Sequence, residues 1–596
     1  MHRINNILLV YPRVPKNTYW SFGYSLAIIG KKSAMPPLGL ITLASLFPDR
    51  CRLKLVDMNV TVLSEADLLW ADAVMVSAMI VQKQSFHTVV AACNRLRRPV
   101  VAGGPYPSAC PEEMAGVDHV VPGEVEENFA AFFSAFERGT APRIADRAKH
   151  PDLKQSPLPR FDLLDLGAYT SMAIQYSRGC PFHCEFCDIW QMYGNRPRVK
   201  PADRVLGELD ALHRLGWRGA VFVVDDNFIG NRKSVKSDLL PSLIQWQQAH
   251  ERPFQFFTEA SIDLAGDNEL MDTMVAAGFN EVFIGIETPS AAALKETGKH
   301  QNLKMDLLTA VEHIQHSGME VTAGFILGFD ADGADIFDRQ IAFIQRAAIP
   351  KAMVGILNAL PGTALYHRLR SQGRLTGASL GNNTHRMSTN FRTRMPAGQL
   401  KAGYRQILGA LYDARMNAYF SRCNRLLDRL AQAYRFKRPI GWREIVMLLR
   451  ALIRQSLTVY GHRYLQFLLR NLIRHRSICG EAVRLAIQGH HFHVITRETL
   501  KMEAMEQELE RAYDYFAARL DTCKQSVRAG SQETMRQLTI LADQCARTLR
   551  RIQKRVNGIP TDFRGEIAHR YRLWAQKLNC LFADGHAQIS EFSRML

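Results

Sequence analysis

"SRGCPFHCEFCDIW" spans residues 177–190 and places Cys180, Cys184 and Cys187 within eight positions. The spacing C-x3-C-x2-C on a loop lets three thiolates converge on one small inorganic centre. A structural zinc site needs a fourth ligand, usually from a second pair of cysteines, and no suitably spaced Cys or His follows. A catalytic zinc ion with three thiolates is an alternative. An iron–sulfur cubane held by three cysteines leaves one iron open, and the missing fourth ligand therefore favours a [4Fe-4S] cluster.

The composition sets limits on the rest of the chain. A chain of 596 residues is longer than a domain with a single hydrophobic core, so we expect several domains. A content of 47% hydrophobic and 22% charged residues is typical of globular proteins. The apolar run near the start, residues 7–11, is too short for a signal peptide or a membrane span. Of the 11 cysteines the other eight are isolated, which suits a reducing compartment. We expect a cytoplasmic protein.

The cysteine motif opens a region, residues 169–375, in which short apolar runs alternate with helical segments. The expected strands are 173–178, 220–226, 254–260, 281–287, 321–329 and 353–360. Six strand–helix units without a phosphate-binding glycine loop predict a partial (β/α)6 barrel, whose site lies at the carboxyl ends of the strands. Polar residues gather at those ends: Asp225, Asp226, Asn227, Glu259, Glu287 and Asn358. Phe-rich strands fit an apolar chamber, and ordinary barrel core is the other interpretation.

Residues 1–150 show a second alternating pattern, which predicts a doubly wound, flavodoxin-like α/β domain. The expected strands are 7–11, 53–57, 73–78, 99–104 and 119–124. Ligands of such sheets bind at the carboxyl ends of the strands, where this chain has Asp57, Asn59, Gly103 and Gly104. Ordinary tight turns would explain these residues equally well. Residues 151–168 hold three prolines and no sustained period, and we interpret them as a linker.

The barrel region resembles the radical S-adenosylmethionine (SAM) superfamily, whose signature C-x3-C-x-aromatic-C is matched by Cys180, Cys184, Phe186 and Cys187. The resemblance implies that SAM chelates the open iron and is cleaved by one electron to a 5'-deoxyadenosyl radical. An external electron donor is therefore implied as well. By position, the resemblance assigns the following residues to SAM: Asp225 and Asp226 to its amino group, Glu287 to its ribose, and Gly324 and Gly328 to its adenine. Residues 357–363 would close the adenine pocket.

The two regions together resemble the cobalamin-binding class of radical SAM enzymes, on the segments 35–40 ("MPPLGL") and 103–108 ("GGPYPS"). The resemblance implies a cobalamin near Asp57, Asn59, Gly103 and Gly104. A D-x-H-x-x-G motif is absent, so no histidine is offered as lower axial ligand of the cobalt. In this class one SAM methylates the reduced cobalamin and another supplies the radical, and the substrate radical then takes the methyl group.

The remaining residues predict helices. We expect a basic helical domain over 376–496 and an amphipathic helical tail over 497–596. Two trios, Arg443/Arg450/Arg454 and Arg463/Arg470/Arg474, share the spacing seven then four, which places each along one helical face. Such helices either rest on an anionic membrane or pack on their own barrel with a solvated basic face. Nucleic acid is not expected, since the net charge of +18 comes without a recognised binding module.

Members of this class with an extra helical carboxyl-terminal domain include methylases of hopanoids and of bacteriochlorophyll precursors. The first hypothesis is therefore cobalamin-dependent methylation of an unactivated carbon on a large, apolar substrate, lipid-like or tetrapyrrole-like. A second is a radical SAM enzyme that oxidises, cyclises or rearranges its substrate without methyl transfer. A third is an idle cluster protein that binds a membrane or partner. The expected location is cytoplasmic, with membrane association on the cytoplasmic face.

Overall fold

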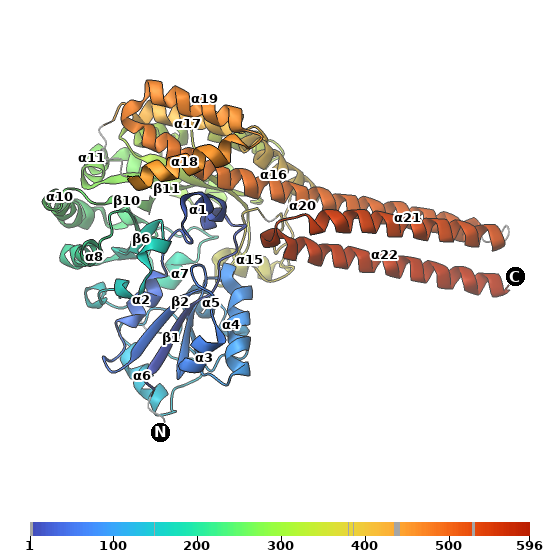
Figure 1. Cartoon of the computed structure of the whole chain (residues 1–596), viewed down its shortest axis with the longest axis horizontal. Coiled ribbons are helices and arrows are strands. Elements are labelled where there is room, and N and C mark those ends of the chain that lie inside the picture. The colour runs from blue at the N-terminus through green and yellow to red at the C-terminus, as the bar shows by residue number, and fades with distance from the viewer. Residues whose placement is uncertain are drawn as a thin grey trace. The chain divides into compact units, whose positions relative to one another are not determined.

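A computed structural model describes residues 4–147, 150–379, 381–385, 387–433, 442–526 and 531–595 (Figure 1). By its internal contacts the chain divides into two units, residues 1–493 and residues 494–596. The first unit contains both predicted sheets and a set of helices. The second unit is entirely helical where it is described.

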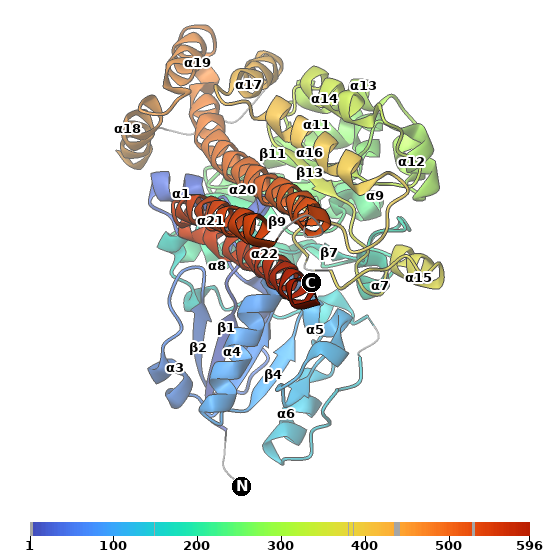
Figure 2. The ribbon, with the colours of Figure 1, turned by 90° about the vertical axis from the view of Figure 1, so that its right-hand side faces the viewer.

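The first sheet has five parallel strands in the order β2-β1-β3-β4-β5. Its strands are β1 (Asn6–Tyr11), β2 (Arg52–Asp57), β3 (Ala73–Ser77), β4 (Val100–Gly103) and β5 (His119–Val120). Successive residues of β1 face opposite sides, so Leu8 and Val10 join one core while Ile7 and Leu9 join the other. Helix α4 (Lys83–Arg95) covers the first face and lies in front of the strands in Figure 2, and α2 (Leu38–Ala44) and α6 (Phe129–Glu137) cover the second face (Figure 1). The predicted doubly wound domain is confirmed.

The second sheet has six parallel strands in the order β13-β12-β11-β10-β9-β6. Its strands are β6 (Ser171–Ile174), β9 (Ala220–Val223), β10 (Gln255–Ala260), β11 (Phe279–Glu287), β12 (Glu320–Leu327) and β13 (Ala352–Ile356). The connecting helices include α8 (Ala202–Arg214), α10 (Leu240–Ala249), α11 (Asn268–Ala277), α13 (Leu307–His316) and α14 (Ile336–Arg346). This is the expected partial (β/α)6 barrel.

One strand prediction is wrong. Residues 173–178 do not form a single strand, because β6 ends at Ile174 and β7 (Ser177–Arg178) pairs separately with β8 (Arg198–Val199). The cause is Asp225, whose carboxylate accepts hydrogen bonds from the backbone N–H groups of Tyr176 and Ser177. These two donors are therefore withdrawn from the sheet, and the chain turns toward the cysteine loop.

Helices of the first unit follow the barrel: α15 (Ala364–Ser371), α16 (Ala397–Leu411), α17 (Asn417–Leu430), α18 (Trp442–Ser456), α19 (Gly461–Arg474) and the first part of α20 (Cys479–Ser526). Arg422 of α17 is fully buried and donates to the carbonyl groups of Ile349 and Leu411. Arg484 of α20 forms an ion pair with the buried Glu320 at the start of β12. These buried charges tie the helices to the amino-terminal end of the barrel.

The second unit consists of the rest of α20, α21 (Ser531–Asn557) and α22 (Thr561–Met595). Phe516 and Leu520 of α20 pack against Leu538, Cys545 and Leu578 of the other two helices. The amphipathic pattern predicted from residue 497 onward therefore has its apolar side in a helical core. Among the described residues we find no helix that combines the length and apolarity needed to cross a bilayer.

Candidate functional site

Asp225 fixes the approach to the cysteine loop. It follows β9 and is fully buried, and its carboxylate accepts from Tyr176 N at 2.8 Å, Ser177 N at 2.7 Å and Ser177 Oγ at 2.6 Å. Burial raises the pKa of Asp225 to about 7, although these hydrogen bonds favour the charged form. Both carboxylate oxygens of Asp225 therefore already accept hydrogen bonds from protein groups. A direct contact between Asp225 and SAM stays a prediction.

The cysteine loop has a tightly determined backbone. Gly179 has φ +95°, and a Cβ there would lie 2.8 Å from the carbonyl oxygen of Gly194, so glycine is required. The N–H of Cys180 donates to that same carbonyl at 3.3 Å. Within the loop, the N–H of Cys187 and the indole N–H of Trp190 both donate to the carbonyl of Cys184, at 3.1 and 3.3 Å.

The three thiols lie close enough to influence one another: Cys184 is buried, and Cys180 and Cys187 are partly buried. Burial raises the pKa of Cys180 to about 11 and raises the pKa of Cys187 well above its usual value, and the nearby Cys184 raises both. Gln301 Nε2 lies 3.8 Å from Cys184 Sγ. Where the chain is described, no group of three His, Cys, Asp or Glu residues is gathered around a single-ion position. In a cubane each thiolate binds a different iron atom, and three neighbouring thiols on one loop fit that donor set.

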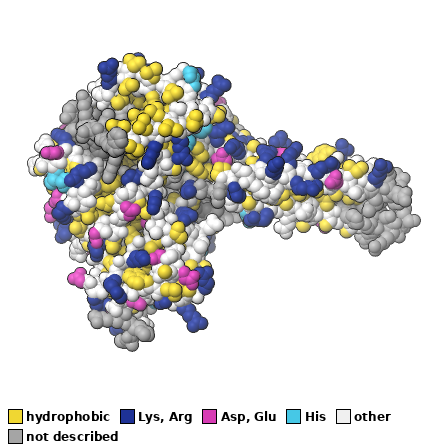
Figure 3. All heavy atoms as spheres, in the orientation of Figure 1, with side chains coloured by type: hydrophobic (Ala, Val, Ile, Leu, Met, Phe, Trp, Pro, Cys, Tyr) yellow, Lys and Arg dark blue, Asp and Glu magenta, His cyan; other side chains and the backbone are white. Residues whose placement is uncertain are grey.

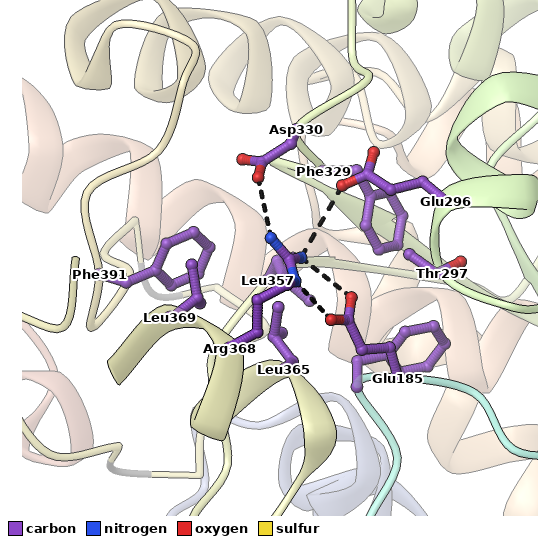
Figure 4. A pocket seen from close by; sticks show the side chains of 11 residues that line it. Glu185, Glu296, Thr297, Phe329, Asp330, Leu357, Leu365, Arg368, Leu369 and Phe391 are labelled. Carbon is purple, nitrogen blue, oxygen red and sulfur yellow. Dashed lines mark hydrogen bonds and ion pairs between the residues drawn. The ribbon is translucent and has the colours of Figure 1, made fainter. Parts of the chain in front are cut away.

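An ion-pair network centred on Arg368 contacts the cysteine loop (Figure 4). Arg368 of α15 forms a bidentate pair with Glu185, which lies between Cys184 and Cys187; Nε–Oε1 is 2.5 Å and Nη2–Oε2 is 2.9 Å. The same guanidinium reaches Asp330 at 3.2 Å and Glu296 at 3.9 Å. The backbone of Glu185 makes two further hydrogen bonds. Its N–H donates to the carbonyl of Thr297 at 3.0 Å, and its carbonyl accepts from the N–H of Leu365 at 2.9 Å. Arg368 therefore fixes the position of the cysteine loop.

We expect Arg368→Gln to lower the cluster content after anaerobic reconstitution by roughly tenfold at limiting iron, as the loss of outer-shell partners of metal ligands commonly does. The reason is that Glu185 loses its bidentate partner and the cysteine loop loses its fixed position. Iron, sulfide and the visible absorbance of the cluster measure this. Arg370→Gln on the exposed side of the same helix is the matched control. Equal cluster content in both variants would rule out the positioning role.

Acidic side chains and one lysine line the strand ends beside the loop. Burial raises the pKa of Asp226 to about 7 and of Glu259 to about 8, each assisted by a neighbouring carboxylate. Glu287 forms a close ion pair with Lys299, whose ammonium is also near Cys184 and Cys187. Glu287 follows a bulge in β11 and has φ +63°, an unfavourable backbone conformation for glutamate. Strain of this kind concentrates at functional sites, and carboxylates here fit the ammonium and sulfonium groups of SAM.

Packing and backbone conformation explain the two glycines assigned to the adenine, without a ligand. A Cβ on Gly324 would lie 3.1 Å from Cζ of Phe283 on the neighbouring strand. Gly328 has φ +97°, and its N–H donates to Asp332 Oδ2 at 2.8 Å in the turn after β12. Gly324 lies within β12 (Glu320–Leu327), and Gly328 is the first residue after it. Their contact with SAM remains a prediction.

The carboxyl edge of the first sheet carries the residues assigned to cobalamin. Asp57 is buried, which raises its pKa, and it accepts from Asn59 Nδ2 at 2.7 Å and from the Tyr169 hydroxyl at 3.0 Å. Asn59 Oδ1 in turn accepts from Val14 N at 2.8 Å. These residues brace the loops after β1 and β2, next to the point between β1 and β3 where the strand order reverses.

The two glycines at that edge differ in what surrounds them. A Cβ on Gly103 would meet only the carbonyl oxygen of Val121, at 3.4 Å, so packing does not require a glycine there. Gly104 has φ +86°, and a Cβ would lie 2.4 Å from Ser77 Oγ, so local packing does require it. A glycine that packing does not require is compatible with a ligand that approaches the backbone closely. That assignment, like those of Asp57, Asn59 and Gly104, stays a prediction.

Buried ion pairs join the two sheets' domains next to the cysteines. Glu124 pairs with Arg178 at 2.7 Å and with Arg198 at 2.6 Å, and Glu126 pairs with Arg178 at 2.6 Å. Arg178 immediately precedes Gly179 and Cys180. Sequence reasoning missed these residues, together with Lys299, Gln301 and Arg368. Of these, only Lys299 and Gln301 could have been suspected from the sequence, because they lie in the polar segment "ETGKHQ" (residues 296–301) that follows β11.

Comparison with known proteins matches three family descriptions. Residues 174–338 match the radical SAM superfamily, residues 26–133 the B12 binding domain, and residues 363–505 a domain of unknown function. Among solved structures, the cobalamin-dependent SAM radical enzyme OxsB, with aqua-cobalamin and SAM bound, is similar with a TM-score of 0.55 and 15% identity. That similarity covers 84% of this chain and 80% of OxsB. The TsrM methyltransferase from Kitasatospora setae has a TM-score of 0.52 and 14% identity over 81% of this chain and 99% of TsrM.

Two curated relatives are more similar in sequence. An uncharacterized methyltransferase of Synechocystis sp. is 44% identical over 68% of this chain and 76% of its own length. The hopanoid C-2 methylase of Rhodopseudomonas palustris is 32% identical over 84% of this chain and 95% of its own length. A B12-binding domain joined to a SAM-cleaving barrel defines the class of cobalamin-dependent radical SAM enzymes. This chain belongs to the methylase family within that class, and its cofactors are a [4Fe-4S] cluster, SAM and cobalamin.

Proposed function

We propose that this enzyme methylates an unactivated carbon of a polycyclic, hopanoid-like lipid. The observation that carries the proposal is the 32% identity to a hopanoid C-2 methylase over 95% of that protein's length. The similarity therefore includes the helices after the barrel as well as the two cofactor domains. The hopanoid C-3 methylase of Methylococcus capsulatus is also similar, at 27% identity over 35% of this chain.

The chemistry divides between the cofactors and the chain. When bound, cobalamin supplies a transferable methyl group, and the cluster with SAM supplies the radical that opens a C–H bond. The chain's own residues have other tasks. We propose that Cys180, Cys184 and Cys187 hold the cluster, while Asp226, Glu259 and Glu287 receive the cationic and hydroxyl groups of SAM. The apolar interior keeps water away from a reactive carbon centre.

Aromatic side chains inside the barrel support an apolar substrate. Phe222 and Phe257, paired in register on β9 and β10, stack with ring centroids 4.6 Å apart. Phe283 on β11 contacts the ring of Trp20, 5.2 Å away, which comes from the loop after β1 of the first domain. Trp20 is 37% exposed, so its ring is available to a ligand. By contrast, Phe254, Phe256 and Phe279 are fully buried barrel core.

We expect Trp20→Ala to raise the KM for the lipid by about tenfold, with little change in SAM cleavage measured without lipid. An aromatic side chain contributes a large apolar contact area to a bound ring system, and its removal leaves that area unfilled. The measurement is methylation rate against lipid concentration. Leu215→Ala, at another exposed apolar residue, is the control. An unchanged KM in Trp20→Ala would contradict the assignment of this wall to the substrate.

Turnover with trideuteromethyl SAM tests the proposed substrate. The reconstituted enzyme is incubated anaerobically with a reductant, cobalamin and hopanoid lipids in detergent, and the lipid extract is analysed by mass spectrometry. We expect one trideuteromethyl group in place of one hydrogen on the ring system. SAM cleavage without any labelled hopanoid, beside labelling of a tetrapyrrole supplied in parallel, would reject the lipid and favour the other substrate class.

The proposal extends to partners and location. Radical SAM chemistry uses an external electron donor, and the substrate is a small molecule. We place the enzyme on the cytoplasmic face of a membrane, because a polycyclic lipid resides in a bilayer. No nucleic acid is expected.

A further inference from the structure

Helices α18 and α19 expose a large apolar surface. Nine of the twenty large hydrophobic side chains that are well exposed among the described residues lie in this short segment. They form what we call the α18–α19 face: Ile445, Leu449, Ile453, Leu457, Val459, Leu465, Leu469, Leu472 and Ile473. Figure 3 shows hydrophobic side chains gathered over these helices, with Lys and Arg around them. Monomeric proteins seldom expose so many apolar side chains together unless the surface binds something.

The two helices have the same angular layout. At about 100° per residue, Ile445, Leu449 and Ile453 form one exposed stripe of α18, while Ala451 and Gln455 lie on its buried side. In α19 the exposed stripe contains Leu465, Leu469, Leu472 and Ile473, while Tyr464, Phe467 and Asn471 are buried. Each helix is therefore anchored by one side and presents a second apolar side outward. The exposed apolar stripes are therefore not the sides by which these helices pack on the rest of the first unit.

Arginines form a third side of each helix, between the apolar stripe and the buried side. At about 100° per residue, Arg450 and Arg454 lie roughly 120° from the centre of the stripe of α18, and Arg463, Arg470 and Arg474 lie roughly 135° from the centre of the stripe of α19. All five are exposed; the side chain of Arg443 lies outside the described residues. Between residues 445 and 480 the sequence contains no Asp or Glu. Arg470 and Arg474 share one carboxylate, Asp428 of α17, at 3.4 and 3.3 Å. The rim of the face is thus strongly cationic.

This chemistry fits an anionic lipid surface better than a second copy of the chain. A symmetric contact would place arginines against arginines with no carboxylate between them in this segment. A bilayer offers acyl chains to the apolar stripe and phosphate groups to the arginines beside it, as for other amphipathic helices that lie in the interface. Arginine also pairs well with phosphate through its planar guanidinium.

Helix α18 contacts the helix that follows the Trp20 segment, through the side away from its exposed stripe. Ala451 of α18 packs on Ile28 of α1 (Gly23–Ile29), and Arg454 donates to the carbonyl of Ala27 at 3.4 Å. Helix α1 begins three residues after Trp20 in the chain. We propose that the α18–α19 face docks the enzyme on an anionic membrane; this deepens the proposed function by naming the surface where its lipid is collected.

Vesicle binding by the full-length protein tests the docking surface. The probes are phosphatidylcholine vesicles with and without phosphatidylglycerol, and the readout is co-sedimentation. We expect binding to the anionic vesicles that weakens as salt is raised, since phosphate–arginine attraction is screened. Ile453→Glu with Ile473→Glu places one carboxylate in each stripe and should weaken binding by about tenfold or more. Both side chains are exposed, at 68% and 67%, so the fold should tolerate the change.

The matched control is Val62→Glu with Leu69→Glu, two exposed apolar residues of the first domain, which should bind as the wild type does. SAM cleavage in detergent should be equal in all three proteins. Wild-type protein that ignores anionic vesicles, or a double variant that binds them equally well, would overturn the proposal. So would a wild-type dimer that Ile453→Glu with Ile473→Glu dissociates, because the face would then be a contact between copies. Failure of hopanoid methylation alone would reject the substrate and leave the docking result standing.

Discussion

Cys184→Ala abolishes both the cluster absorbance and the production of 5'-deoxyadenosine, which is the largest effect that we expect of any single substitution. With one of three thiolates removed, a cubane loses a ligand that no neighbouring residue replaces among those described. Without the cluster there is no electron for SAM. The measurement is anaerobic reconstitution, followed by the visible spectrum and chromatography of the SAM products.

Cys580→Ala is the matched control, since this cysteine is exposed and lies in the helical unit of residues 494–596. It should retain the full cluster and full SAM cleavage. Circular dichroism checks that the Cys184 variant is folded. SAM cleavage that persists in folded Cys184→Ala would refute the assignment of the cysteine motif.

Omission of cobalamin stops methyl transfer while SAM cleavage continues. The cluster loop lies on the barrel, whereas the candidate cobalamin residues lie at the edge of a separate sheet, so loss of one cofactor leaves the other site intact. We expect methylated product to fall below detection and 5'-deoxyadenosine to remain within about twofold. Cobalamin added back to the same sample should restore methylation. Full methylation without cobalamin would show that the first domain has another role.

The fold was largely predictable from the sequence because parallel strands buried on both faces are continuous apolar runs. Ten of the eleven expected ranges each contain one strand of the predicted sheet, and both sheets have the predicted type. The exception, residues 173–178, depended on one distant carboxylate. No local pattern shows that Asp225 will capture two N–H groups from a segment 48 residues earlier in the chain.

The site was less predictable. The cysteine motif is recognisable because three cysteines close in sequence leave a fixed spacing. Arg368 is not, since its partner Glu185 is 183 residues away and neither residue type is unusual. For the polar turn residues the sequence pattern was ambiguous in another way. Asp57 and Asn59 have the positions of ligand contacts in the sequence, yet in the structure they hydrogen-bond each other and nearby loops. The spacing of residues in a short motif indicates a local site, whereas contacts between residues far apart in the chain are found only in the three-dimensional structure.

The products formed from SAM distinguish radical methyl transfer from direct methyl transfer. In one anaerobic reaction with a hopanoid acceptor, S-adenosylhomocysteine, 5'-deoxyadenosine and methylated lipid are quantified over time. We predict equal amounts of all three, because one SAM provides the methyl group and another provides the radical. Methylated lipid formed with S-adenosylhomocysteine but without 5'-deoxyadenosine would contradict this prediction, since the C–H bond would then have been replaced without a radical.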